Sequence, residues 1–238
     1  MTFDSIKIHC SSLGYLFTEP REKAKKDAGE LSASAKEHLY KVYIEQYWGR
    51  KRQLSNKQVR KGLIVEPQSI QLISLLDGVL YEKNEESREN EYIIGTPDIV
   101  TETQIQDVKS SYDAETFIPM LLDPLEKMYD YQMQGYLWLF DKDEALVRRC
   151  LISTPQEIVE EEKYYLLKSM NVATEENPEY KRRSAELEYN LTFEDIPLSE
   201  REITHKVPRN EQIIEAIPSK VGKAREFLNF LHKIHTKQ

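Results

Sequence analysis

Two aspartates and a lysine stand close together in the stretch GTPDIVTETQIQDVKSSY, residues 95–112. Asp98 and Asp107 are nine residues apart, and Lys109 follows the second after one residue. Isoleucines and valines surround them, so we expect these carboxylates in or at the ends of buried strands, where an unpaired charge is costly. Two oxygen ligands that meet at one point suit a hard cation, Mg²⁺ or Mn²⁺.

The residues between the two aspartates indicate how they meet. Segments 91–100 and 104–112 are rich in β-branched and aromatic residues and are divided by Thr-Glu-Thr, which is typical of a β-hairpin. Across a hairpin the aspartates can face each other on neighbouring strands. Because a strand has a period of two, Lys109 points to the same side as Asp107, where an ammonium can orient water or offset phosphate charge. A salt-bridged strand pair without a metal is the alternative.

The composition fits one soluble globular domain. The chain has 238 residues, of which 39% are hydrophobic and 31% charged. It contains no run of about 18 apolar residues and begins with no pattern typical of a signal peptide. We therefore expect a cytoplasmic protein with no membrane contact, in which Cys10 and Cys150 are reduced and buried.

Charge is distributed unevenly along the chain. The net charge is −8, but residues 1–61 carry 13 Lys and Arg against 7 Asp and Glu, and residues 219–238 carry 5 against 1. Residues 62–218 carry 15 against 33. A basic front beside an acidic middle favours a phosphate-facing surface beside a metal-attracting one. Ordinary solvated surface charge is the alternative interpretation.

The remaining sequence predicts the elements that hold the hairpin in place. Their order gives an α/β protein with a central mixed β-sheet flanked by α-helices. We expect an extended run and helix start at 6–17, a helix from a Ser32 or Ser34 cap to Gly49, a mostly helical segment 63–78 that is kinked or restarted at Pro67, a helix from an Asp123 cap to 140, a strand at 144–152, a helix from a Thr154 cap to 170, a late strand within 193–208, and an amphipathic helix at 219–234.

Several catalytic patterns are missing from the sequence. The five histidines form no HExxH motif, and no Gly-x-Ser-x-Gly elbow or Cys–His pair suggests covalent catalysis. No phosphate-binding glycine loop of the GxxxxGK[ST] or GxGxxG type is present. Chemistry based on carboxylates and a divalent cation is therefore the best-supported class.

The order Pro97-Asp98 … Asp107-Val108-Lys109 resembles the PD-(D/E)XK nuclease pattern. The following segment, YDYQMQGYLWLF, is similar to the glutamine-containing helix of its RecB-like and lambda-exonuclease-like branches, with Gln132, Gln134 and Tyr136 in the corresponding places. Upstream, Glu66 follows Gly62 as the first acid of that family does, although Pro67 departs from a regular helix.

The resemblance implies a restriction-endonuclease-like core and a role for each of these residues. The helical N-terminal part would span about 1–80, the catalytic sheet and helix about 90–152, and a mainly helical C-terminal part 153–238. Asp98, Asp107 and the Val108 carbonyl would hold Mg²⁺ or Mn²⁺, and Glu66 would share a second ion. Lys109 would orient or deprotonate the attacking water, and Gln132 would position water, lysine or phosphate. The residues expected to contact DNA are Ser12 (or Ser11), Arg21, Arg50, Lys51, Arg52, Arg60, Lys61, Gln134 and Tyr136.

The implied activity is Mg²⁺-dependent exonuclease digestion of linear duplex DNA, 5′ to 3′, in phage-type recombination. The family further implies a ring-shaped homotrimer and a single-strand annealing protein as partner. Two alternatives stay open. One is an endonuclease of the same superfamily, of the restriction type, and the other is a non-catalytic DNA-binding protein with a degenerate nuclease fold.

Overall fold

A four-stranded mixed sheet forms the centre of the protein in this computed structural model, which describes residues 1–51 and 56–237. Its order is β4-β5-β6-β7, in which β5 and β6 are parallel and the other neighbours antiparallel. The strands are β4 Ile99–Val100, β5 Gln104–Ser110, β6 Glu144–Cys150 and β7 Glu202–Pro208. The predicted mixed sheet flanked by helices is confirmed.

A second, smaller sheet has the order β1-β3-β2, with β1 Ile8–His9, β2 Arg88–Glu89 and β3 Ile93–Gly95. The predicted strand 91–100 was therefore wrong as one element, because its two halves belong to different sheets. Pro97 has no N–H to give to a ladder, so the chain leaves β3 before it and enters β4 after Asp98. The predicted hairpin exists as β4 and β5 alone.

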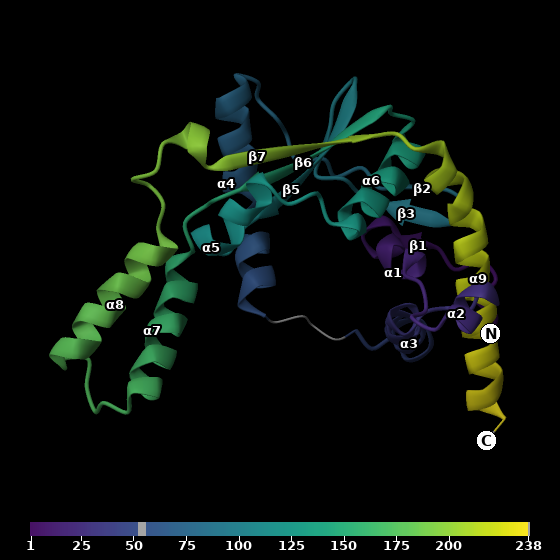
Figure 1. The fold of residues 1–238 in the computed structure, drawn as a ribbon, viewed down its shortest axis with the longest axis horizontal. Coiled ribbons are helices and arrows are strands. Elements are labelled where there is room, and N and C mark those ends of the chain that lie inside the picture. The colour runs from purple at the N-terminus through teal and green to yellow at the C-terminus, as the bar shows by residue number, and fades with distance from the viewer. Residues whose placement is uncertain (52–55, 238) are drawn as a thin grey trace.

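Helices cover both faces of the large sheet and both ends of the molecule (Figure 1). Along the longest axis, α9 stands at one end and the α7–α8 pair at the other. The helices are η1 Cys10–Ser12, α1 Leu13–Phe17, α2 Lys23–Asp27, α3 Ala33–Trp48, α4 Lys57–Asp77, α5 Ala114–Phe117, η2 Ile118–Leu121, α6 Lys127–Phe140, α7 Gln156–Met170, α8 Pro178–Leu191, η3 Leu198–Glu200 and α9 Glu211–Thr236. In the described ranges no helix is both long and apolar enough to cross a membrane.

The helix starts were predicted with mixed success. Ser32 caps α3 as expected, since its Oγ accepts from the Ala35 N–H at 2.9 Å, and Gly49 ends the helix at φ 62°. The Asp123 cap was wrong, because the Asp123 N–H bonds to the Pro119 carbonyl at the end of η2 and α6 begins four residues later. The Thr154 cap was also wrong, since α7 follows Pro155 without a side-chain cap.

Helix α4 is continuous through Pro67, which corrects the expected restart of the helix there. A proline at this position deprives the Leu63 carbonyl of its helical hydrogen bond. Leu63 and Pro67 are both exposed, so water can satisfy that carbonyl. On the other side of the helix Val65 and Ile73 are buried, and this packing holds α4 against the sheet.

The two faces of the large sheet carry different side chains because residues along a strand alternate. One face packs on α6, where Ala145 and Val147 join Met133 and Leu137 in the main hydrophobic core. The opposite face packs on α4, where the buried side chains of Val108 and Cys150 meet Ile70, Leu72 and Ile73.

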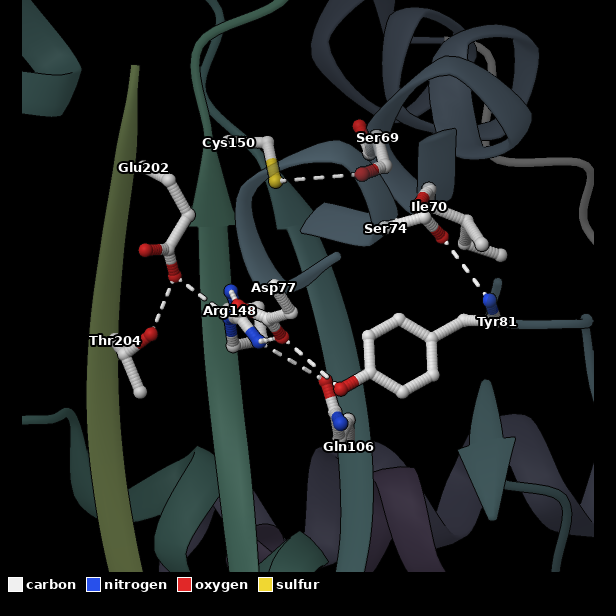
Figure 2. Close-up of polar contacts among 10 residues, drawn as sticks. All are labelled: Ser69, Ile70, Ser74, Asp77, Tyr81, Gln106, Arg148, Cys150, Glu202 and Thr204. Atoms are coloured by element: carbon white, nitrogen blue, oxygen red, sulfur yellow. Dashed lines mark hydrogen bonds and ion pairs between the residues drawn. The ribbon is translucent and has the colours of Figure 1, made fainter. Parts of the chain in front are cut away.

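A buried arginine organises the α4 face (Figure 2). Arg148 is 4% exposed and donates to Asp77 Oδ2 at 2.7 Å, to Glu202 Oε1 at 2.7 Å and to Gln106 Oε1 at 3.2 Å. The Tyr81 hydroxyl also donates to Asp77, at 3.0 Å. The network ties the end of α4 to β5, β6 and β7, and so fixes the sheet beneath the predicted site.

We expect Arg148→Ala to lower the free energy of unfolding by about 3 kcal/mol, because it leaves two partly buried carboxylates without their cation. Urea denaturation followed by circular dichroism measures this loss. Arg183→Ala, which removes an exposed arginine paired with Glu179 on α8, is the matched control and should leave the midpoint unchanged. Equal effects of the two substitutions would contradict the role given to Arg148.

Candidate active site

The β4–β5 hairpin brings the two predicted aspartates together. Ile99 pairs with Gln106 and Val100 with Ile105, so the next position of this register places Asp98 opposite Asp107. Asp98 Oδ2 accepts the Val108 N–H at 2.7 Å, which holds the carboxylate against β5. Asp107 is 2% exposed. The structure therefore places two carboxylates at one buried point, as the spacing predicted.

This placement makes the negative charges costly. Burial raises the pKa of the Asp98 carboxyl to about 7, and the charge of Asp107 adds to the rise, while Lys109 and the Val108 N–H oppose it. A pair of this kind gains from any cation that neutralises it.

Asp107 has one partner on each oxygen. Its Oδ2 forms an ion pair with Lys109, and its Oδ1 accepts from Gln132 Nε2 at 3.1 Å. Burial alone would lower the pKa of Lys109, but the charges of Asp107 and Asp98 outweigh it and the pKa is raised. Lys109 is therefore held as an ammonium beside both carboxylates.

Gln132 connects α6 to the aspartate pair. It is 6% exposed, and its Nε2 lies 3.1 Å from both Asp107 Oδ1 and the Tyr136 hydroxyl. Tyr136 in turn donates to the Thr96 carbonyl at 3.3 Å. A Cβ on Gly95 would come within 2.6 Å of the Tyr136 ring, so glycine is needed there for the ring to approach β3.

Glu66 lies near the aspartates but has another partner. Its charge contributes to the raised pKa of Asp98, and its Oε1 is 2.6 Å from Lys83 Nζ. Over residues 1–51 and 56–237, no group of three or more His, Cys, Asp or Glu side chains is assembled for a metal. The third carboxylate is thus close to the pair without joining it.

The donor set nevertheless fits one hard cation. The N–H and C=O of one strand residue point to the same edge, so the Val108 carbonyl faces the side where Asp98 binds its N–H. Mg²⁺ is commonly held by one or two carboxylates and keeps several waters. Two carboxylates and one carbonyl at a buried point meet that requirement.

Three residues expected to contact DNA lie in the interior instead. Lys61, Gln134 and Tyr136 are 0%, 1% and 5% exposed. Gln134 donates to the Pro208 carbonyl at 3.0 Å and accepts from the Asn210 N–H at 2.8 Å, so it links α6 to the β7–α9 connection. These placements correct the expectation of a DNA contact, because the polar atoms of all three are turned inward.

The basic front is partly neutralised within the protein. Arg60 pairs with Glu161 of α7 at 2.8 Å, and Lys51 lies 3.4 Å from Glu45. Arg21 and Arg50 are exposed. The net positive charge that the basic front presents to solvent is therefore smaller than a count along the sequence suggests.

Two further residues predicted to contact DNA are Ser12 and Arg52. Ser12, at the start of α1, is half-buried and makes no side-chain capping bond. Arg52 lies outside the described residues.

Known structures resemble this chain over nearly its whole length. A phage-related exonuclease from Haemophilus somnus 129PT is 30% identical, covers 97% of this chain and 97% of its own, and superposes with a TM-score of 0.76. This chain belongs to the phage-type exonucleases of the PD-(D/E)XK kind. The alkaline exonuclease LHK-Exo from Laribacter hongkongensis shares the fold, with a TM-score of 0.63 at 12% identity over 97% of this chain and 94% of its own. No family model and no curated protein matches the sequence.

The exonuclease has buried charges that the sequence interpretation overlooked. Strand β6 carries Arg148 and Arg149 side by side, and alternation sends one to each face of the sheet. Arg149 is 7% exposed and pairs with Glu126. Two adjacent arginines after the apolar run Ala145–Val147 were the signal, since each must find a partner when buried.

Lys61 is a buried amine rather than a surface cation. Its Nζ donates to the Tyr112 carbonyl at 2.7 Å and lies 5.3 Å from the centre of the Phe193 ring. Burial lowers the pKa of Lys61 from 10.5 to about 8, with Asp113 opposing the change. The folded protein therefore holds this proton less tightly than the unfolded chain does.

The sign of the effect on stability follows from that difference. Between pH 8 and 10.5 the unfolded chain binds more protons at Lys61, so the contribution of this group to the unfolding free energy rises with pH. Relative to Lys61→Met, the wild-type protein should gain about 2 kcal/mol from pH 8 to pH 10. Denaturant titrations of both proteins at each pH measure it. A difference that stays constant over this window would contradict the buried amine.

Proposed function

We propose that this exonuclease hydrolyses the phosphodiester bonds of linear duplex DNA with the help of Mg²⁺ or Mn²⁺. The observation that carries the proposal is the pair of facing carboxylates, the half-buried Asp98 and the buried Asp107, with the Lys109 ammonium against them. Because burial and the charge of Asp107 raise the pKa of Asp98 to about 7, the pair gains strongly from a divalent cation.

The proposed ligands are Asp98, Asp107 and the Val108 carbonyl. A divalent cation bound there lowers the pKa of a water ligand and offsets the charge of the scissile phosphate. Lys109, held as an ammonium by Asp107, orients the attacking water and donates to the phosphate oxygens as their charge grows. Gln132 fixes the second oxygen of Asp107 and so keeps that carboxylate turned toward the hairpin.

A second ion, shared by Glu66, is part of the proposal. Lys83 pairs with the Glu66 carboxylate at 2.6 Å, so this carboxylate becomes a ligand only when Lys83 moves away. Because more than half of the Lys83 side chain is exposed, its displacement by a cation costs little.

The finer features of the activity come from the family. We include in the proposal 5′-to-3′ polarity, a ring-shaped homo-oligomer and a single-strand annealing protein as recombination partner. Of the two alternatives, an endonuclease would also cut closed circular DNA, which gives a direct comparison. The non-catalytic alternative is less favoured because the lysine and the glutamine both contact Asp107, and Asp98 lies opposite this aspartate on the neighbouring strand.

We expect Asp107→Ala and Lys109→Ala each to reduce the Mg²⁺-dependent digestion of linear duplex DNA by at least about 100-fold, because each removes charge placed at the reacting phosphate. Release of nucleotides from a duplex labelled at one 5′ end measures the rate. Excess chelator should reduce the wild-type rate to background, and the exposed Asp195→Ala is the matched control.

Thermal unfolding of each variant separates lost chemistry from lost folding. A folded Asp107→Ala or Lys109→Ala variant that digests DNA at the wild-type rate would remove the proposed mechanism. Cleavage of closed circular duplex at a comparable rate would favour the endonuclease instead.

A further inference from the structure

We propose that Arg149 binds a backbone phosphate of the DNA strand next to the phosphate being hydrolysed, and that Glu126 occupies this place in the DNA-free protein. The inference rests on the proposed DNA substrate and adds to it a second phosphate site. Nothing in the family pattern of two acids, lysine and glutamine includes either residue.

The sheet register puts Arg149 directly beside the catalytic lysine. Lys109 of β5 and Arg149 of β6 are paired residues of two parallel strands. Paired residues of parallel strands point to the same face, which here is the face that also carries Asp107. Both cations lie toward the carboxyl ends of their strands, the edge at which α/β sheets bind ligands.

One aromatic ring holds both cations. The centre of the Tyr129 ring lies 5.4 Å from Lys109 Nζ and 5.1 Å from Arg149 Cζ. The ring attracts each cation through its electron-rich π system without accepting a conventional hydrogen bond. The ring therefore takes no N–H group from either side chain.

The donors of Arg149 exceed its acceptors. A guanidinium has five N–H groups, and Glu126 takes those on one nitrogen. Arg149 is 7% exposed, and its Nε is buried with no hydrogen-bond partner anywhere in the described part of the chain. A buried donor without an acceptor costs about 1–3 kcal/mol, so the arrangement favours a ligand that brings oxygens.

Near Arg149, the Nε2 atom of His205 is a second potential hydrogen-bond donor to a phosphate. This atom is also buried, and the part of the chain that the structure describes offers it no partner. Burial lowers the pKa of His205, and the nearby charge of Arg149 lowers it further. A neutral histidine beside Arg149 can give one N–H to a phosphate oxygen without adding repulsion between cations.

Glu126 resembles a displaceable anion more than a fixed structural partner. The side chain of Glu126 is 46% exposed, whereas that of Arg149 is 8% exposed. The Glu126 carboxylate therefore reaches Arg149 from the solvent side. Glu126 is the N-cap residue of α6 but makes no side-chain cap bond there. Only the Glu126 side of this pair is substantially exposed to solvent, and arginine can bind a phosphate through two parallel hydrogen bonds, so a phosphate can take the place of the carboxylate.

The competing explanation is an ion pair that only fixes the start of α6. The two explanations predict different changes in DNA affinity. If the pair is structural, Arg149→Gln and Glu126→Gln both disturb the same contact and act alike. If Glu126 stands where a phosphate binds, Arg149→Gln weakens DNA binding and Glu126→Gln strengthens it.

The experiment measures binding of the full chain to a fluorescent linear duplex by anisotropy, with chelator present, over a series of salt concentrations. We expect Arg149→Gln to raise the dissociation constant about 10-fold and to reduce the slope of log K against log salt by about 1. Glu126→Gln should lower the dissociation constant several-fold. The matched control is Arg183→Gln, an exposed arginine paired with Glu179 on α8, which should change neither quantity.

Glu126→Gln decides the test if Arg149→Gln does not fold, because the altered side chain is nearly half exposed. Tighter binding by Glu126→Gln supports the inference, and unchanged or weaker binding overturns it. DNA binding and digestion by the wild-type protein, compared with those of Asp107→Ala, separate this result from the proposed function. Wild type that neither binds nor digests duplex DNA overturns both, whereas wild type that digests DNA while Glu126→Gln binds no better overturns only the phosphate site.

Discussion

The repulsion between two facing carboxylates, the half-buried Asp98 and the buried Asp107, is the interaction on which the rest of this structure depends. A hairpin with a fixed register forces them together, and the Val108 N–H, Gln132 and Lys109 each offset part of the cost. Even so, the pKa of Asp98 rises to about 7. Such an arrangement is poorly suited to stability alone and well suited to capturing a cation, because a divalent ion turns an unfavourable contact between two carboxylates into a favourable one.

The two faces of the large sheet have different roles around this pair. One face stabilises the fold, and the other carries the candidate site. On the α4 face, Arg148 joins the end of α4 to three strands, and each of its three side-chain nitrogens has an acceptor inside the protein. On the α6 face, the adjacent Arg149 has donors to spare and lies beside Lys109. Because the side chains of β6 alternate between the two faces of the sheet, Arg148 stabilises the fold and Arg149 lies at the candidate site. The same physical property, a buried guanidinium, stabilises the fold where its acceptors are complete and favours a ligand where they are not.

The local parts of this account could be predicted from the sequence, and the non-local parts could not. The meeting of Asp98 with Asp107 and the orientation of Lys109 need only a short hairpin and a period of two. The division of 91–100 between two sheets depends on pairing with β1, which lies more than 80 residues earlier in the chain. Helix α4 passes through Pro67 because packing on the sheet outweighs a lost hydrogen bond. Lys61 and Gln134 were assigned to a DNA surface because charge and motif give no measure of burial, and the basic front was overestimated because a count of charges ignores pairs such as Arg60 with Glu161.

The most direct test of the central claim is crystallography of the wild-type protein soaked in Mn²⁺, with anomalous diffraction used to locate the ion. The account predicts a single strong peak, or the stronger of two, between the carboxylates of Asp98 and Asp107 and within bonding distance of the Val108 carbonyl. Crystals that show no anomalous peak at this hairpin at saturating Mn²⁺, or peaks only at other sites, would contradict it.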